Sequence, residues 1–366
     1  MMRARWTGTA AEVGLALAVA AAGFYITATA TLENAGCPWG SGPLAFRSKS
    51  PAPQEAGPSP FDVPTEGYGK VTGGEGKPVV EVTTTSLTGP GSLTEALSGG
   101  DRIVRFKVGG TFKLDQKLTV SHANVTIDGR DAPAPGVNFT GKERLLIASN
   151  NVILRNLRFR GMGGDGIACQ GDGIIVDHCS VSDTKDGSID MTDWQKTGKV
   201  KNCTISYCIL GPTNKVQLNS VLPTASVHHT IFYKGVQRNP QYNAGACGDV
   251  RNCIVYGWKG EGIDINAGST VNVIRNVFFQ LGQPKRGPLR ADGQVYAEGN
   301  VGNVDIAKGS ASTPYAEPKV TTQPALEAAK LVLEKSGCWP RDDVDRKIVS
   351  EIQGALAGLS DKPPKK

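Results

Sequence analysis

The chain has 366 residues, of which 46 are glycine and 22 are proline, and its formal net charge is +6. Glycine is far above its usual ~7% but follows no three-residue period, which excludes collagen, and glycine plus proline stays below the ~25–30% typical of disordered low-complexity chains. The mild positive charge suits an anionic partner, but the lysines and arginines form no basic run, so nucleic acid is not expected as a partner.

Residues 1–30 have the pattern of a secretory signal peptide. The basic start Met1-Met2-Arg3-Ala4-Arg5 precedes an apolar run that reaches Ala28, and Ala28-Thr29-Ala30 offers a cleavage site between small residues. The run is shorter than the ~20 residues of a membrane-spanning helix. We therefore expect a secreted protein, extracellular or periplasmic, with an uncleaved membrane anchor as the alternative and contact with a membrane only in that case.

Four further segments follow along the chain. Residues 31–60 are rich in proline, glycine and serine, which indicates a flexible linker. Residues 61–310 form the predicted main domain. Within residues 311–358 the apolar residues follow a helical period that Cys338-Trp339-Pro340 interrupts, so two short C-terminal helices are expected to pack on that domain. Residues 359–366 are expected to be a flexible tail.

A short phrase repeats through the predicted main domain. It consists of an apolar residue, any residue, and then Asn, His or Gly, and successive copies lie 22 to 27 residues apart. A period in this range is typical of a repeat architecture. The copies are Ile127-Asp128-Gly129, Leu154-Arg155-Asn156, Val176-Asp177-His178, Val200-Lys201-Asn202, Val227-His228-His229, Val250-Arg251-Asn252 and Ile274-Arg275-Asn276, and Asn300 closes the series.

Each repeat contains two or three short strands separated by glycine, asparagine and aspartate turns, and no helix. Such units must stack to bury their apolar faces, so we predict an all-β right-handed parallel β-helix of about eight coils with ~24 residues each. The repeated positions then stack as turn ladders, which makes His178 and His229 structural residues rather than catalytic ones. Asp128, Asp177 and Arg155 are expected to face solvent.

The eight cysteines leave two interpretations open. An exported protein can form disulfides, but the six cysteines between residues 169 and 253 are as well explained as small core residues of strands. No zinc-ligand spacing occurs among the cysteines and histidines.

Three acidic residues come together if the coils stack. Asp186 and Asp190 are four residues apart, which places both carboxylates on one face of a strand, and Asp165 lies about one coil earlier. Three carboxylates invite a hard cation such as Ca²⁺, which binds six to eight oxygen ligands with flexible geometry. Isolated solvated turn aspartates are the alternative. Two coils further on, Lys215 and Arg238 provide cations, and Pro240 stiffens the chain beside Arg238.

Several phrases in the same order resemble the pectate lyases of polysaccharide lyase family one. They are Glu66-Gly67-Tyr68-Gly69, Gly89-Pro90-Gly91-Ser92-Leu93, Ile174-Ile175-Val176-Asp177-His178, the acidic pair Asp186 and Asp190, Asn202-Cys203-Thr204-Ile205-Ser206-Tyr207, and Asp342-Asp343-Val344-Asp345-Arg346-Lys347-Ile348-Val349. The resemblance covers about residues 61–355. The Trp of the third phrase is replaced by Ile175.

The resemblance implies a carbon–oxygen lyase that acts on an anionic polysaccharide, polygalacturonate or pectin. Asp165, Asp186 and Asp190 would bind Ca²⁺, Lys215 would contact the galacturonate carboxylate, and Arg238 would bind substrate and remove its C5 proton for β-elimination. Arginine is an awkward base because the guanidinium group keeps its proton up to a pKa above about 12. Activity is therefore expected to rise with pH. The protein is expected to be a monomer.

One departure bears on substrate binding. The family phrase is Arg-x-Pro-x-x-Arg, but Asn243 stands where the second arginine would contact a substrate carboxylate. We expect Arg251 or Arg275 from a neighbouring coil to replace it. Without a replacement, a non-catalytic β-helix that binds polysaccharide remains an alternative. A β-helix glycoside hydrolase is a third interpretation, since it needs two acids flanking the bond.

Overall fold

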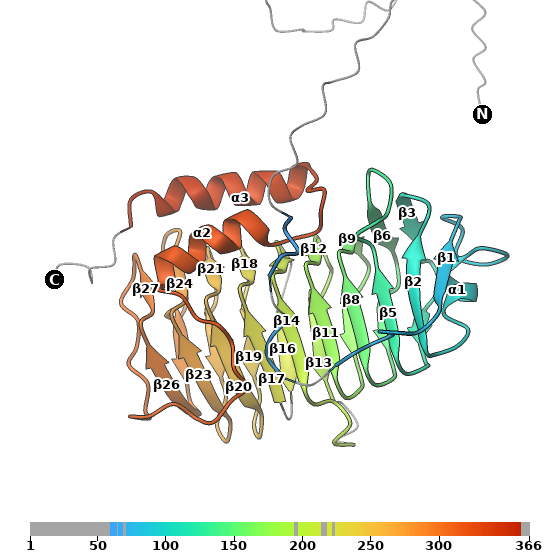
Figure 1. Ribbon diagram of the computed structural model, residues 1–366. Coiled ribbons are helices and arrows are strands. Elements are labelled where there is room, and N and C mark those ends of the chain that lie inside the picture. The colour runs from blue at the N-terminus through green and yellow to red at the C-terminus, as the bar shows by residue number, and fades with distance from the viewer. Residues whose placement is uncertain are drawn as a thin grey trace, which may run out of the picture. The chain divides into compact units, whose positions relative to one another are not determined.

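The computed structural model describes residues 59–63, 65–68, 71–193, 197–213, 218–221 (backbone) and 224–359. Three parallel sheets run along one stack of coils, and each complete coil gives one strand to each sheet (Figure 1). The predicted all-β right-handed parallel β-helix is thereby confirmed. The predicted signal segment, most of the linker, Lys215 and the end of the tail lie outside the described residues.

The strands of each sheet pair in parallel with the strands of the adjacent coils. The ten-stranded sheet consists of β1 (Val79–Val82), β2 (Arg102–Phe106), β5 (Val125–Asp128), β8 (Val152–Arg155), β11 (Ile174–Asp177), β14 (Cys203–Ser206), β17 (Thr224–His228), β20 (Cys247–Arg251), β23 (Thr270–Ile274) and β26 (Gln294–Glu298). The nine-stranded sheet consists of β3 (Gly110–Lys113), β6 (Val137–Gly141), β9 (Arg158–Met162), β12 (Ser180–Ser182), β15 (Ile209–Leu210), β18 (Ile231–Tyr233), β21 (Ile254–Tyr256), β24 (Val277–Phe279) and β27 (Val301–Gly302).

The eight-stranded sheet carries the candidate site. It consists of β4 (Leu118–Val120), β7 (Leu145–Ile147), β10 (Ile167–Cys169), β13 (Ile189–Thr192), β16 (Leu218–Val221), β19 (Gln241–Tyr242), β22 (Ile263–Ile265) and β25 (Leu289–Ala291). Alternate residues of these strands enter the core, as period two requires. Ile167, Ile189, Ile263 and Leu289 are buried at equivalent inward positions.

The core is a stack of like side chains from successive coils. Phe112, Phe139 and Phe159 lie above one another with ring centroids 5.5 and 4.9 Å apart. Cys179 and Cys208 occupy the same turn position in adjacent coils, and the backbone N–H of Cys179 lies 3.4 Å from Sγ of Cys208. Both are buried thiols, as are Cys169, Cys203, Cys253 and Cys338. These cysteines are therefore small residues of the core with free thiols.

The turns after the strands of the ten-stranded sheet explain the repeated Asn and His. His178 and His229 have φ angles of 49° and 50°, a left-handed conformation that few side chains tolerate. Their rings stack on Tyr207 at centroid distances of 5.0 and 4.8 Å. Both histidines are ladder residues, as predicted. The prediction that Asn202 is the ladder residue of its coil was wrong. Asn202 precedes β14, and Tyr207 occupies the ladder position of that longer coil.

The helices α2 (Ala325–Lys335) and α3 (Asp343–Leu356) cover the outer face of the nine-stranded sheet, and the short α1 (Leu93–Ala96) lies near the other end of the chain (Figure 1). The side chain of Asp342 caps α3 by accepting a hydrogen bond from the N–H of Asp345 at 2.9 Å. Arg160 of β9 forms ion pairs with both aspartates, at 3.1 and 2.7 Å. The acidic start of α3 therefore anchors the helix to the coils.

A segment before the first strand covers part of the ten-stranded sheet. The backbone oxygen of Pro60 lies 2.9 Å from Nε2 of His178, and Thr204 donates a hydrogen bond to the backbone oxygen of Tyr68 at 3.0 Å. Asp128 and Asp177 are only 3% and 6% exposed. The prediction that these side chains face solvent was wrong, because it assumed that nothing lies over this sheet.

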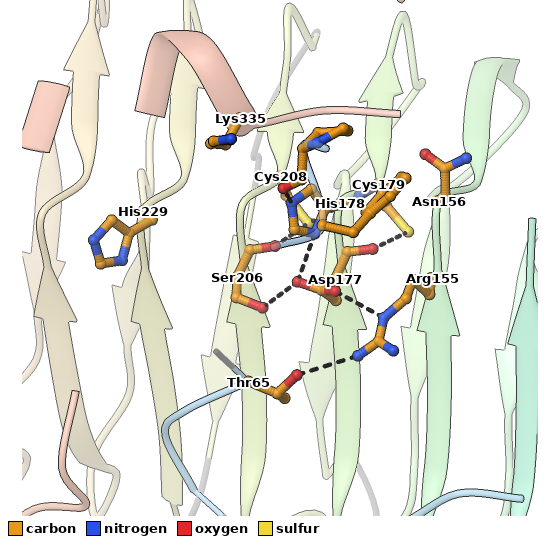
Figure 2. A network of polar contacts seen from close by, with 12 residues as sticks. Thr65, Arg155, Asn156, Asp177, His178, Cys179, Ser206, Cys208, His229 and Lys335 are labelled. Atoms are coloured by element: carbon orange, nitrogen blue, oxygen red, sulfur yellow. Dashed lines mark hydrogen bonds and ion pairs between the residues drawn. The ribbon is translucent and has the colours of Figure 1, made fainter. Parts of the chain in front are cut away.

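A network of polar contacts surrounds Asp177 (Figure 2). Its carboxylate accepts hydrogen bonds from Arg155 at 2.9 Å and Ser206 at 2.7 Å, and Nδ1 of His178 lies 2.9 Å from it. Arg155 also donates to Thr65 of the covering segment at 3.2 Å. Burial alone would raise the pKa of the Asp177 carboxyl, but His178, Arg155 and Ser206 outweigh it and lower the pKa to about 2.

Asp177→Asn is expected to lower the free energy of unfolding by about 3 kcal/mol at neutral pH, because it leaves the largely buried Arg155 guanidinium group without its anion. The native pKa is lowered, so the stabilisation is present above the unfolded-state pKa of about 4 and is lost as the pH falls toward 2. Urea denaturation at several pH values measures both effects. Glu81→Gln, which breaks the exposed pair with Lys107, is the control and should cost less than about 1 kcal/mol. Equal losses in the two variants would contradict this account.

Candidate functional site

A row of polar side chains follows the outward positions of the eight-stranded sheet. Asp190 of β13, Gln241 of β19, Asp264 of β22 and Arg290 of β25 share one register line, and the backbone of β16 passes between the first two. Their strand neighbours point into the core, so this line faces away from it. The row is acidic at one end and contains an arginine at the other, which suits an extended anionic ligand that bridges to a cation.

The three predicted carboxylates lie on two adjacent coils, but only Asp190 belongs to the row. Asp165 lies two residues before β10, and its Oδ1 accepts a hydrogen bond from the N–H of Gly187 at 2.9 Å. The neighbouring N–H of Asp186 donates to the backbone oxygen of Gly164 at 3.2 Å, so Asp165 and Asp186 lie on adjacent turns. Asp190 lies in β13, whereas Asp186 lies in the turn before it. The sequence argument that both belong to one strand was therefore wrong, although the two coils are adjacent as predicted.

A cation already neutralises Asp165. Nη1 of Arg144 lies 2.7 Å from its Oδ2, and the Arg144 side chain is 46% exposed. Asp190 accepts a hydrogen bond from the N–H of Thr192 at 2.8 Å. Within the described ranges, no three Asp, Glu, His or Cys side chains converge as a metal site. The donor set consists of carboxylate oxygens and fits a hard cation, but a cation at Asp165 has to displace Arg144.

Arg238 lies one coil beyond β16, two residues before Pro240. Its φ of 63° is left-handed, and the following residue ties the turn to the next coil. Asn239 donates its backbone N–H to the oxygen of Gly262 at 2.8 Å and its side-chain amide to the oxygen of Glu261 at 3.1 Å. These bonds hold Arg238 beside Glu261 on the adjacent coil.

Glu261 is a functional candidate that the sequence analysis missed. It is 5% exposed, and Arg286 lies 3.7 Å from its carboxylate. Burial and the nearby Asp264 raise the pKa of the Glu261 carboxyl, while Arg286, Arg290 and Arg238 oppose that rise. Arg286 thus lies beside this carboxyl, and the charges of Arg238 and Arg290 also act on it. The 24-residue period could have revealed this cluster, because it places residues 261–264 and 286–290 one and two coils after Arg238.

The prediction that Arg251 or Arg275 replaces the second arginine was wrong. Arg251 and Arg275 belong to the ten-stranded sheet and its turns, not to the sheet that carries Arg238. Arg251 pairs with the buried Asp249, and Arg275 lies 3.9 Å from Glu298. The coils have three faces. The sequence period shows which coil each arginine occupies, but not which face.

Known proteins resemble this chain over most of its length. Residues 136–306 match the family model described as right handed beta helix region. The probable pectate lyase C of Emericella nidulans is 28% identical over 323 residues, covering 78% of this chain and 74% of the relative. That of Aspergillus fumigatus is 29% identical over 334 residues, covering 80% and 77%. A solved structure of a pectate lyase bound to a hexasaccharide shares the fold, with a TM-score of 0.56 and 15% identity over 73% of this chain and 94% of the other.

The described residues contain the three helices α1, α2 and α3. None of their helices is both long and apolar enough to cross a membrane.

Proposed function

We propose that this homologue of the pectate lyases is itself a secreted, Ca²⁺-dependent polysaccharide lyase that cleaves polygalacturonate by β-elimination. The observation that carries the proposal is the polar row of the eight-stranded sheet, with carboxylates at one end and the arginine cluster around Glu261 at the other. The sequence relationship to pectate lyases supports a lyase rather than another β-helix function.

The reaction needs a base, a means of stabilising charge and a departing oxygen. Arg238 would take the C5 proton of a galacturonate unit, the C5 electron pair would form the C4=C5 double bond, and the C4 glycosidic oxygen would leave with its bonding electrons and acquire a proton. Negative charge develops on the substrate carboxylate during proton removal, so fixed positive groups beside it lower the barrier. Lys215 would provide such charge.

Asp165, Asp186 and Asp190 would hold Ca²⁺ by carboxylate oxygens. When bound, the ion would neutralise the galacturonate carboxylate and acidify the adjacent C5–H. Arg144 would have to leave Asp165 first, and its half-exposed side chain can turn into solvent. This exchange predicts competition between the Arg144 guanidinium and Ca²⁺ for the same carboxylate.

A second function is favoured by one observation. Asn243 replaces the second arginine of the family phrase, and its side-chain oxygen accepts a hydrogen bond from Asn266 at 2.7 Å. A chain that lost this contact could bind polysaccharide without cleaving it. A hydrolase is the third possibility, since two acids could flank a bond in the acidic end of the row.

Product analysis with polygalacturonate distinguishes the three functions. A lyase generates reducing ends together with the ultraviolet absorbance of an unsaturated uronate. A hydrolase generates reducing ends without that absorbance. Retained binding of the polymer without either product would contradict both enzymatic functions and support the binding protein. A matched incubation with methyl-esterified pectin shows whether free carboxylates are required.

A further inference from the structure

The replacement of an arginine by Asn243 leaves a gap in the cationic part of the site. Asn243 and Asn266 hydrogen-bond to each other at 2.7 Å and so continue a ladder of amides rather than a binding contact. A polyuronate presents a carboxylate on each sugar, and each one that enters a protein site needs a positive partner. Another cation on the same face of the β-helix could fill the gap.

Arg290 has the required position. It lies in β25 on the register line that passes through Asp264 and Gln241, so it faces outward two strand steps from β19. With neighbouring strands ~4.8 Å apart, two steps amount to ~10 Å along the axis of the coils. Its side chain is 33% exposed, so a ligand can reach part of it.

A buried carboxylate fixes the orientation of Arg290. Asp264 is 1% exposed, and its Oδ1 accepts a hydrogen bond from Nη1 of Arg290 at 3.0 Å. Its Oδ2 accepts a hydrogen bond from Nε2 of Gln241 at 2.6 Å, so both carboxylate oxygens are used. Asp292 holds the other terminal nitrogen of Arg290. A guanidinium group held in this way loses little further entropy when it binds a second carboxylate.

We propose that Arg290 binds a carboxylate of another sugar of the polymer and so compensates for the missing arginine, and that Asp264 is its positioning residue. The inference rests on the proposed function, because it assigns the polyuronate substrate of the same site. The contact lies about two coils from the coil of Arg238. It therefore engages a sugar remote from the bond that breaks, and only a substrate long enough to reach β25 benefits from it.

Such a remote contact changes binding more than chemistry. Arg290→Gln is expected to raise the KM for long polygalacturonate by about tenfold, the usual effect of losing a charged hydrogen bond, with kcat nearly unchanged. Short oligogalacturonates should show no such change. Arg290→Lys should recover part of the affinity, because it restores the charge but not the planar fork. Asp264→Asn should also raise the KM, because it releases Arg290.

Arg275→Gln is the matched control. The Arg275 side chain is 37% exposed and ion-paired with Glu298, but it belongs to the ten-stranded sheet. Its substitution should leave the KM unchanged at every substrate length. Thermal unfolding of each variant establishes that the fold is retained.

Affinity electrophoresis in gels containing polygalacturonate provides a readout that needs no catalysis. Weaker retardation of Arg290→Gln than of the wild type and of Arg275→Gln would support the inference. Equal retardation, or a KM that rises equally for short and long substrates, would overturn it. A wild-type protein that yields no unsaturated product, but is retarded through Arg290, would instead refute the lyase function and leave the binding contact intact.

Discussion

Arg238→Lys is expected to reduce the rate of polygalacturonate cleavage by about two to four orders of magnitude, the range typical of a lost general base. The ammonium group keeps a positive charge but cannot place a nitrogen where the longer, planar guanidinium group reaches. The loss should therefore appear in kcat measured with saturating polymer, and polymer binding should persist. Rates measured by ultraviolet absorbance across a pH series test the role of Arg238, and the residual activity should no longer rise with pH as in the wild type.

Arg275→Lys is the control for this substitution. Arg275 also has a left-handed backbone, with a φ of 52° against 63° for Arg238, so any local backbone effect of the exchange is matched. The control should retain wild-type kcat. If Arg238→Lys also retains it, Arg238 is not the base.

Removal of Ca²⁺ is expected to abolish cleavage, and Asp190→Asn should raise the Ca²⁺ concentration needed for half-maximal activity by about tenfold or more, since affinity depends on the number of charged ligands. Arg144→Gln should lower this Ca²⁺ concentration, because Ca²⁺ then no longer has to displace the Arg144 guanidinium group from Asp165. Calorimetric titration of Ca²⁺ without substrate measures both shifts independently of turnover.

Asp172→Asn provides the control for the calcium variants, because Asp172 forms a partly exposed pair with Lys201 at 3.4 Å, away from the acidic end of the row. It should bind Ca²⁺ as the wild type does. Cleavage that survives a chelator, or a wild-type Ca²⁺ affinity in Asp190→Asn, would contradict the assignment of the metal ligands.

The fold could be predicted because its determinants are local and repeated. A left-handed turn residue recurs once per coil, so His178, His229 and Asn252 report the period directly. The same period brings Asp165 and Asp186 to adjacent turns. Tyr207 broke the pattern, because an aromatic residue in the left-handed conformation carries no sequence signal, and the longer coil before it shifted the register.

The partners of the site residues could not be predicted in the same way. Arg144 reaches Asp165 from the preceding coil, and Arg290 reaches Asp264 from the following one. These pairs depend on which of three faces each residue occupies, which a period alone does not state. The burial of Asp177 depends on a covering segment more than a hundred residues away in sequence.

Cleavage of polygalacturonate in water labelled with heavy oxygen tests the central claim most directly. β-Elimination forms the new chain end without adding water, so the account predicts unsaturated products that are lighter than saturated fragments by one water molecule and carry no label. Saturated fragments that carry one heavy oxygen at the new end would show hydrolysis and contradict the account.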